Sequence, residues 1–479
     1  MSKKKYLFDI DKFRDFAKWY HEILKQAEIV DIRYPVKGMN VWRPYGYKAL
    51  RNVLKILRDL LEATGHEEAY FPTMIPESLF AKEKEFLEGF GGETFVVEGT
   101  KTRKFSEKLY VRPTSETVMY YMWSIWIKGK KDLPVKMYQV VNVFRYETKA
   151  THPILRVREI VSFIEAHTAH ATMEEAEKQI REAVDIYKKF YDTLLIPYFI
   201  VLTPPWDTFS GAEYNYDFIT PMPDGKALEL GSVINLGQRF SKAFDIRFMD
   251  EDGSFKYVYQ TCYGISERSL GAVIAVHGDN KGLFLPPEVA PIQVVIVPIA
   301  RREEKDIVDY ARKINKLLRE NGIRSYLDDD PERTPGWKYY YWDMKGVPTR
   351  LEVGRKELEN RTVTIARRDR IEKRTVSIDS LINELRDVWK DIEATLYKRA
   401  LEQFKKLVII TENPEEVGGR KGLIVTPWDG TEECAEELES ITGKGVIGTI
   451  VESPIRLPTK GKSICGKESN KWALLGVTY

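Results

Sequence analysis

The stretch VVNVFRYE, residues 140–147, decides the fold prediction: a run rich in β-branched and aromatic residues ends in an arginine and a glutamate. A polar loop and then LRVRE, residues 155–159, bring further arginines close by. Side chains of a strand alternate between its faces, so Arg145 and Glu147 are expected on one face. A guanidinium beside a carboxylate suits a bound nucleotide, with the arginine on a phosphate. A solvated strand face with ion pairs inside the hairpin explains the same pattern.

Length and composition limit the number of domains and the class of protein to which the chain can belong. The 479 residues exceed the roughly 250–300 at which a single core stops growing, so two to four domains are expected. The 74 Lys and Arg nearly balance the 72 Asp and Glu, and bulk charge therefore neither demands nor excludes a polyanionic partner. Three cysteines cannot form a disulfide framework, which indicates a reducing, cytoplasmic setting. Neither a signal peptide nor a membrane span is predicted.

The first 285 residues are expected to form one large α+β unit, in which antiparallel strands alternate with helices. Apolar residues at helical spacing predict helices over residues 9–30, 46–64 and 172–194. The runs that resemble strands are 69–72, 109–112, 136–146, 160–166, 227–230 and 268–276.

Three prolines in residues 286–291 predict a stiff linker and a domain boundary. Residues 292–385 then read as a small, mainly parallel α/β domain, because strands and helices alternate. Residues 386–479, with an acidic helix and Gly-rich turns, are expected to form a third, small α+β unit. The expected elements of the second domain are strands at 294–298, 323–327, 350–353 and 362–367 and helices at 301–321 and from about 380.

Two further segments contain polar and charged residues that are suited to binding a ligand. Residues 262–278 place Arg268 at the start of an apolar run, and a buried arginine needs an anion beside it. Either a phosphate or the neighbouring Glu267 meets that need. Residues 112–116, RPTSE, form a proline-led turn that presents hydroxyls and a carboxylate; taken alone, this turn is better explained as the start of a helix.

Taken together, these segments resemble the three signature motifs of class II aminoacyl-tRNA synthetases. Residues 65–72, GHEEAYFP, resemble motif 1, the dimer-interface helix and strand with its proline. Residues 144–159 resemble motif 2, and residues 264–268, GISER, resemble motif 3. The resemblance implies an antiparallel-sheet catalytic domain, an α/β anticodon-binding domain and a homodimer.

Within this class, the chain resembles the prolyl-tRNA synthetase family over essentially its whole length. Glu147 and Arg268 lie only 121 positions apart, which leaves no room for the large editing insertion of the bacterial type. The resemblance is therefore to the archaeal/eukaryotic type. The family-like segments are residues 112–116, 155–159, 165–168, 236–242 and 277–283.

The resemblance implies that ATP and L-proline form prolyl-adenylate, and that tRNA(Pro) then accepts the prolyl group. It assigns Arg145 to the α-phosphate and the proline carboxylate, and Glu147 to the adenine amino group. Arg268 would hold the γ-phosphate, so Arg145 and Arg268 are the expected catalytic residues. Arg156 is a further ATP-binding candidate, and Glu229 stands near the ribose or Mg²⁺, which enters with ATP.

The implied proline pocket must hold a secondary ammonium and a small apolar ring. Thr114 and Glu116 would accept hydrogen bonds from the nitrogen, and Phe163 would wall the ring. A satisfied core histidine and a packing cysteine are the alternative accounts of His167 and Cys262. Alanine and cysteine are close to proline in size, so both are expected to be misactivated. The full set of candidates is Thr114, Glu116, Arg145, Phe163, His167, Ser232 and Cys262.

The second domain resembles the anticodon-binding domain of this subclass. Unstacked bases need donors, acceptors and flat groups, and the candidates are Arg333, Lys338, Glu352 and Arg355. A basic cluster over residues 361–374 is either a nucleic-acid backbone contact or a solvated strand edge.

The third unit resembles a module that holds zinc with four cysteines in relatives. Only two thiols remain at the four positions, so structural zinc is not expected and no metal-ligating residues are predicted. The family implies that Tyr479 folds back toward the catalytic domain. The four positions are Asp429, Cys434, Ser463 and Cys465.

Two alternatives stay open at this point. The three motifs are also compatible with another synthetase of the same subclass, threonyl or glycyl. It is also compatible with a tRNA-binding paralogue without catalysis, although such paralogues usually lose the charged nucleotide contacts that Arg145, Glu147 and Arg268 represent.

Overall fold

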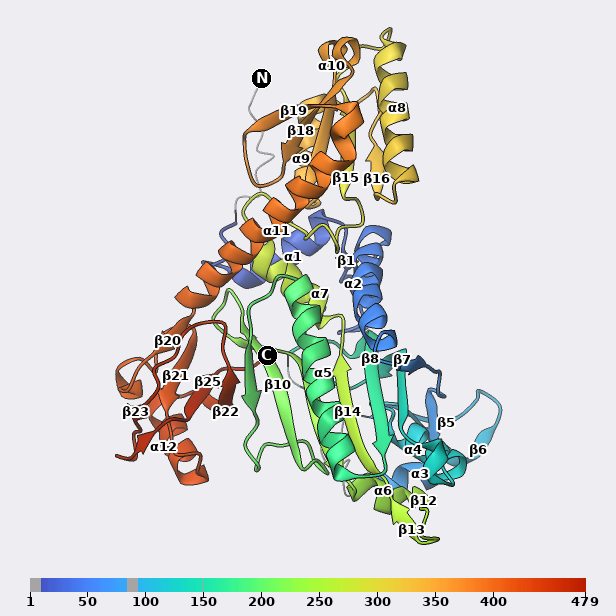
Figure 1. Cartoon of the computed structure of the whole chain (residues 1–479), viewed down its shortest axis with the longest axis vertical. Helices are drawn as coiled ribbons and strands as arrows, with labels where there is room; N and C mark the ends of the chain where they lie inside the picture. Colours follow the sequence, from blue (N-terminus) through green and yellow to red (C-terminus); the bar gives the residue numbers. More distant parts are fainter. Residues whose placement is uncertain (1–9, 84–93, 149) are drawn as a thin grey trace.

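The computed structural model describes residues 10–83, 94–148 and 150–479. Figure 1 shows a small sheet with its helices at one end of the long axis and a much larger sheet filling the other end. The long helix α11 (Leu381–Lys406) runs between the two ends. The start of the chain, through residue 9, lies outside the described residues.

The larger sheet carries the first unit and has eleven strands in the order β20-β21-β25-β22-β9-β10-β11-β14-β8-β7-β3. Its central strands pair antiparallel, as expected. The helix α5 (Met173–Thr193) lies on one face, where it contacts β8, β11 and β14. The strands of this part are β3 (Glu67–Glu68), β7 (Val135–Phe144), β8 (Glu159–His170), β9 (Phe199–Leu202), β10 (Tyr214–Pro221), β11 (Ala227–Gly237) and β14 (Tyr259–Ile265).

Smaller elements surround this sheet. The predicted first two helices are found, and the first is shorter than expected. The helices are α1 (Phe16–Gln26), α2 (Pro44–Glu62), α3 (Glu77–Phe80), α4 (Glu116–Trp126), α6 (Arg239–Phe244) and α7 (Arg268–His277). The small strands are β1 (Val30–Asp31), β2 (Val41–Trp42), β4 (Met74–Pro76), β5 (Val96–Gly99), β6 (Lys104–Val111), β12 (Arg247–Met249) and β13 (Phe255–Tyr257).

Two predicted strands of this unit are wrong. Residues 69–72 are irregular, because side chains take the place of a partner strand: Phe71 N–H donates to Gln139 Oε1, and Phe71 O accepts from Arg112. Residues 268–276 belong to helix α7. Residues 269–277 of this helix are all buried, so its sequence is mostly apolar and shows neither a strand nor a helix period.

The second unit has a five-stranded sheet in the order β16-β15-β17-β18-β19. The prediction of a mainly parallel sheet is only half right: β15 pairs parallel with β16 and β17, whereas β18 pairs antiparallel with β17 and β19. The elements are β15 (Val294–Pro298), α8 (Lys305–Glu320), β16 (Ser325–Leu327), α9 (Pro335–Met344), β17 (Thr349–Val353), α10 (Arg355–Asn360), β18 (Thr362–Arg367) and β19 (Lys373–Ser377).

The third unit is not a separate sheet. Its strand β22 pairs with β9, so its strands extend the large sheet of the first unit. Helix α11 also passes straight through the predicted boundary between residues 385 and 386. The elements are β20 (Val408–Ile410), β21 (Leu423–Pro427), α12 (Glu432–Thr442), β22 (Gly445–Glu452), β23 (Gly461–Lys462), β24 (Glu468–Ser469) and β25 (Trp472–Gly476).

The proline-rich linker before β15 is held from both sides. Asn52 on α2 donates to the carbonyls of Val289 and Ala290. From the second unit, the guanidinium of Arg324 donates to the carbonyls of Pro287, Glu288 and Ala290. These bonds fix the second unit against α2 and supply partners for carbonyls that a proline-rich segment cannot pair in a ladder.

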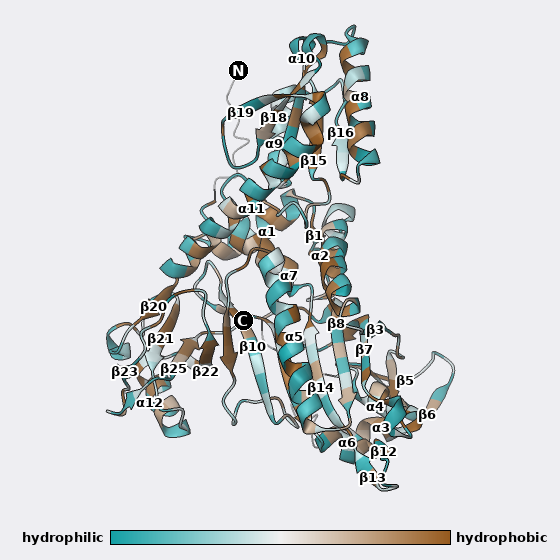
Figure 2. Ribbon diagram, in the orientation of Figure 1, coloured by the Kyte–Doolittle hydropathy of each residue, from teal (hydrophilic) through white to brown (hydrophobic). Residues whose placement is uncertain are grey.

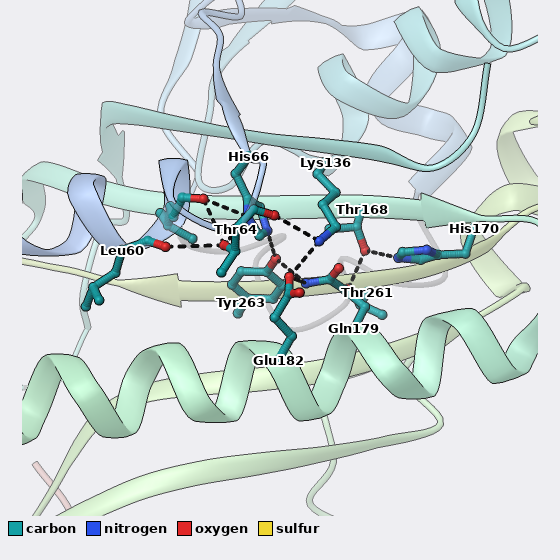
Figure 3. A network of polar contacts seen from close by, with 11 residues as sticks. Leu60, Thr64, His66, Lys136, Thr168, His170, Gln179, Glu182, Thr261 and Tyr263 are labelled. Carbon is teal, nitrogen blue, oxygen red and sulfur yellow. Dashed lines mark hydrogen bonds and ion pairs between the residues drawn. The ribbon is translucent and has the colours of Figure 1, made fainter. Parts of the chain in front are cut away.

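A polar network fills the space between α5 and the large sheet (Figure 3). His66 contacts the Tyr263 hydroxyl through Nε2, and Gln179 donates to the same hydroxyl at 3.2 Å. Lys136 donates to Glu182 at 2.6 Å and to Thr64 O at 3.1 Å. The network thus ties the end of α2 to strands β7 and β14, and β14 carries Cys262, which lines the cavity described below.

Histidines in and beside this network should make the protein acid-sensitive. Burial and the nearby Lys136 lower the pKa of His66 and of His170 to about 4 each. Between about pH 4 and the ordinary value near 6.5, the unfolded chain therefore binds more protons than the folded chain. We expect the free energy of unfolding to fall as pH drops through this window, and His170→Gln to flatten the decline. Urea unfolding at several pH values measures this; a free energy that does not change with pH would contradict it.

Candidate active site

One cavity of about 230 Å³ opens on the face of the large sheet opposite α5. Its walls come from strands β8, β11 and β14, from the start of α4 and from motif 3 itself. Nine of the eleven predicted ATP- and proline-site residues line it: Thr114, Glu116, Arg145, Phe163, His167, Glu229, Ser232, Cys262 and Arg268. Segments far apart in the sequence therefore meet at one site.

Arg145 lies just beyond the end of β7 and not on the strand face as predicted. Its Nε donates to the Pro113 carbonyl at 3.0 Å, and its guanidinium lies 5.7 Å from the centre of the Phe163 ring. Burial lowers the pKa of Arg145, and the nearby charge of Arg268 lowers it further while Glu116 opposes the shift. Two guanidinium groups that line one cavity favour an anion between them.

Arg268 is the first residue of α7, so its guanidinium and the helix N-terminus place positive charge at the same point. Its Nε donates to Leu155 O at 2.9 Å, and Nη1 donates to Glu229 O at 3.0 Å. The Glu229 carboxylate is 4.0 Å away and half exposed. The sequence alternative, in which Glu267 neutralises Arg268, is not what the structure shows: Glu267 accepts from Val161 N and from the Ser162 hydroxyl.

Glu147 and Arg156 lie beside the cavity and do not line it. Both side chains are mostly buried, and Arg156 Nε donates to Glu147 Oε2 at 2.7 Å. Arg156 Nη1 also donates to the backbone oxygen of Tyr479 at 3.0 Å. The Tyr479 hydroxyl donates to Asp224 at 2.8 Å, so the end of the chain does fold back onto the catalytic domain as expected.

The inner end of the cavity combines polar and apolar side chains. The Thr114 hydroxyl donates to Glu116, and His167 Nδ1 is 2.9 Å from the Tyr120 hydroxyl. A side chain at Gly264 would meet the Phe163 ring at 2.9 Å, so this glycine makes room for that ring. Burial raises the pKa of the Cys262 thiol well above its usual value, and the thiol therefore stays protonated at neutral pH.

Sequence reasoning missed several residues in and beside the site, among them Glu165, Phe209 and Asp217. Glu165 lines the cavity and lies two residues before His167 on β8, so the strand period could have found it. Phe209 also lines the cavity, but it comes from an irregular loop without a periodic signal. Asp217 on β10 lies beside the site; burial and the charge of Glu229 raise its pKa to about 6.

The four anticodon candidates divide into two pairs. Arg333 and Arg355 are exposed: Arg333 stacks 3.9 Å from the Trp337 ring, and Arg355 pairs with Asp306. Lys338 and Glu352 are buried and engaged inside the domain, contrary to the expectation that they face bases. Lys338 donates to Asp328 O at 2.7 Å, and Glu352 pairs with Arg350 and Lys373.

The basic cluster over residues 361–374 is neutralised by ion pairs within the protein. Arg367 pairs with Asp369 and Asp391, and Arg368 pairs with Asp279 of the first unit. This favours the solvated strand edge over a dedicated backbone contact. In the third unit, Asp429 is engaged by Lys467 at 2.8 Å, and Cys465 lies 3.6 Å from Glu437.

The fold and the cavity define a class II aminoacyl-tRNA synthetase. Residues 95–277 match the family model of the class II tRNA synthetase core domain (G, H, P, S and T), and residues 293–388 match that of the anticodon binding domain. No helix in the described ranges is long and apolar enough to cross a bilayer.

Whole-chain comparisons narrow the class to one family. A proline–tRNA ligase of Methanopyrus kandleri is 48% identical over 440 residues, which cover 91% of this chain and 90% of that protein. A proline–tRNA ligase of Pyrococcus abyssi is 45% identical over 472 residues, which cover 97% of this chain and 98% of that protein. A Giardia lamblia prolyl-tRNA synthetase in complex with prolyl-adenylate superposes with a TM-score of 0.93 at 33% identity, covering 98% and 100% of the two chains.

The chain belongs to the proline–tRNA ligase family. It is an enzyme, and its activity is the ATP-dependent ligation of proline to tRNA. The threonyl and glycyl alternatives and the non-catalytic paralogue are accordingly set aside.

Proposed function

We propose that the cavity binds L-proline at its inner end and the phosphates of ATP at its outer end. The observation that carries this proposal is that Arg145 and Arg268 line the same cavity as Thr114, Glu116 and His167. Glu116 and the Thr114 hydroxyl face the secondary ammonium, and Phe163 packs on the ring. Arg145, between the two ends, contacts both the carboxylate and the α-phosphate.

The chemistry needs positioning and positive charge and no protein nucleophile. The proline carboxylate oxygen attacks the α-phosphorus, the bond to the bridging oxygen breaks, and pyrophosphate leaves. Arg145 and Arg268 offset the charge that develops on the phosphate oxygens. A hydroxyl of the terminal ribose of tRNA(Pro) then attacks the prolyl carbonyl carbon, the bond from that carbon to the phosphate oxygen breaks, and AMP leaves with the hydroxyl proton passing to solvent or to the phosphate.

Mg²⁺ is expected to enter with ATP. Glu229 is half exposed at the cavity, and Asp217 lies beside it on the neighbouring strand. Carboxylate oxygens are the ligands that Mg²⁺ prefers, and the ion commonly combines one or two of them with substrate phosphates. When bound, the ion would neutralise phosphate charge. Glu229 and Asp217 are the residues placed to hold it.

Amino-acid-dependent exchange of pyrophosphate into ATP, run with each of the twenty amino acids, tests the proline pocket. Proline should give the highest kcat/KM. Alanine and cysteine should give measurable exchange, lower by about ten- to two-hundredfold, because an apolar pocket separates such small differences by only ~1–3 kcal/mol. Faster exchange with threonine or glycine than with proline would contradict the assignment. If neither alanine nor cysteine supports pyrophosphate exchange at saturating concentration, the argument that the pocket cannot exclude amino acids of similar size is contradicted.

For tRNA, the proposal assigns the anticodon contact to the exposed pair Arg333 and Arg355, with Trp337 as a stacking surface. Arg333→Ala should lower proline transfer to tRNA(Pro) by roughly five- to 150-fold, the loss expected for one contact of about 1–3 kcal/mol. Pyrophosphate exchange should not change, since adenylate forms far away in the first unit. Arg312→Ala, another paired surface arginine of this domain, is the matched control. Equal losses in both variants would contradict the assignment.

The proposal also includes a homodimer and a cytoplasmic site of action. Tyr70 in motif 1 is 73% exposed, and the exposed Trp126 packs against the adjacent Phe71. An exposed aromatic surface of this kind suits a second copy of the chain. Sedimentation should give a particle of twice the 55.6 kDa chain mass.

A further inference from the structure

Three different metal-ligating side chains meet at the inner end of the cavity. Glu116 begins α4, His167 lies on β8 and Cys262 lies on β14. The ligand atoms of these residues all lie within 4.8 Å of one another, and all three residues are buried. They are the only such group of three among the described residues.

His167 is already oriented for a ligand. Its Nδ1 contacts the Tyr120 hydroxyl at 2.9 Å, and this bond fixes the ring. Its Nε2 is buried and has no hydrogen-bond partner within the described part of the chain, although Glu165 Oε2 lies 3.5 Å away. The side chain is only 1% exposed. The 3.5 Å contact with Glu165 satisfies this nitrogen only in part, and a metal ion bound to Nε2 would replace that contact.

From this geometry we propose that Glu116, His167 and Cys262 form a zinc site inside the cavity. One thiolate, one imidazole and one carboxylate suit Zn²⁺, whereas Mg²⁺ prefers oxygen ligands alone. Three protein ligands leave a fourth position, which faces the open cavity. Binding releases the thiol proton of Cys262 to solvent, so that the metal replaces a proton on sulfur.

The site has a functional consequence that rests on the proposed function. Glu116 and His167 are the same side chains that face the proline nitrogen and ring. Zinc and proline therefore exclude each other, and zinc competes with proline but not with ATP for the free enzyme. Millimolar Mg²⁺ leaves the three ligands unoccupied, because it binds soft ligands poorly.

Cobalt binding tests the site without relying on activity. The chain has three cysteines, so in a full-length Cys434→Ala/Cys465→Ala variant any thiolate bound to cobalt is Cys262. Titration of the metal-free variant with Co²⁺ should produce a thiolate-to-cobalt charge-transfer band that saturates at one ion per chain. Zn²⁺ should abolish the band, saturating proline should suppress it, and adding Cys262→Ala should eliminate it. Neither Cys434 nor Cys465 lines the cavity, so proline-dependent exchange by the metal-free variant shows that it is folded.

Absence of the band from the folded variant would overturn the zinc site, as would a band that survives Cys262→Ala. A band that persists at saturating proline would overturn the competition. Should the double variant not fold, the wild-type protein serves: the proline-sensitive part of its band should be one thiolate per chain, and no proline-sensitive part refutes the site. Failure of the proposed function is separate, since it is recognised by loss of proline-dependent exchange in the metal-free wild-type protein.

Discussion

Arg145→Ala should slow proline-dependent pyrophosphate exchange by about a hundred- to a thousandfold, the usual loss when one preorganised donor to transition-state charge is removed. Arg145 is the residue that touches both halves of the reaction in our proposal. It stands between the Phe163 ring, at the proline end, and the positive charge of Arg268, at the ATP end. The loss should therefore appear in kcat and in kcat/KM for both substrates.

Two controls separate this effect from a general loss of structure. Arg145→Lys keeps the charge but not the planar fork, so it should recover only a small part of the activity. Arg181→Ala removes an exposed arginine from α5 and should not alter the rate. Exchange by a folded Arg145→Ala protein at the wild-type rate would refute the role given to this residue.

Arg268→Ala should give the second largest effect, and one confined to ATP. Removing a charge-assisted contact of about 1.5–3 kcal/mol should raise KM for ATP by roughly ten- to 150-fold. KM for proline should change little, because Arg268 lies at the outer end of the cavity. Steady-state exchange with each substrate varied in turn measures the two values.

The matched control for this variant is Arg247→Ala, which removes an arginine paired with Asp245 on the surface. Arg268 also holds Leu155 O, so thermal unfolding of the Arg268→Ala protein should be compared with that of the control. An equal rise in both KM values, or a rise for proline alone, would show that Arg268 does not bind the triphosphate.

Much of the site could be predicted because its residues lie in contiguous motifs. Arg145, Arg268 and the Thr114–Glu116 turn each sit where a strand ends or a helix begins, and such positions are visible in a sequence. Strand period alone would have added Glu165 to His167. The roles of the individual residues toward ATP and proline came from the resemblance to a known family, because the residue patterns alone left those roles open.

What could not be predicted depends on long-range contacts. Phe209 reaches the cavity from a loop whose course is set by the folded strands around it. From the sequence, Lys338 is expected to be an exposed cation. In the structure it is buried, because the carbonyl and the carboxylate of Asp328 both accept from its ammonium group. The third unit reads as an independent domain, yet β22 joins β9 across more than two hundred residues of sequence. Helix α7 lacks a period because its residues 269–277 are all buried.

The most direct test of the central claim is a crystal structure of this protein with a non-reactive prolyl-adenylate analogue. The account predicts the pyrrolidine ring against Phe163 and His167, with the linkage that replaces the phosphate beside Arg145. An analogue bound outside this cavity, or bound inside it with its ring turned away from both residues, would contradict the account.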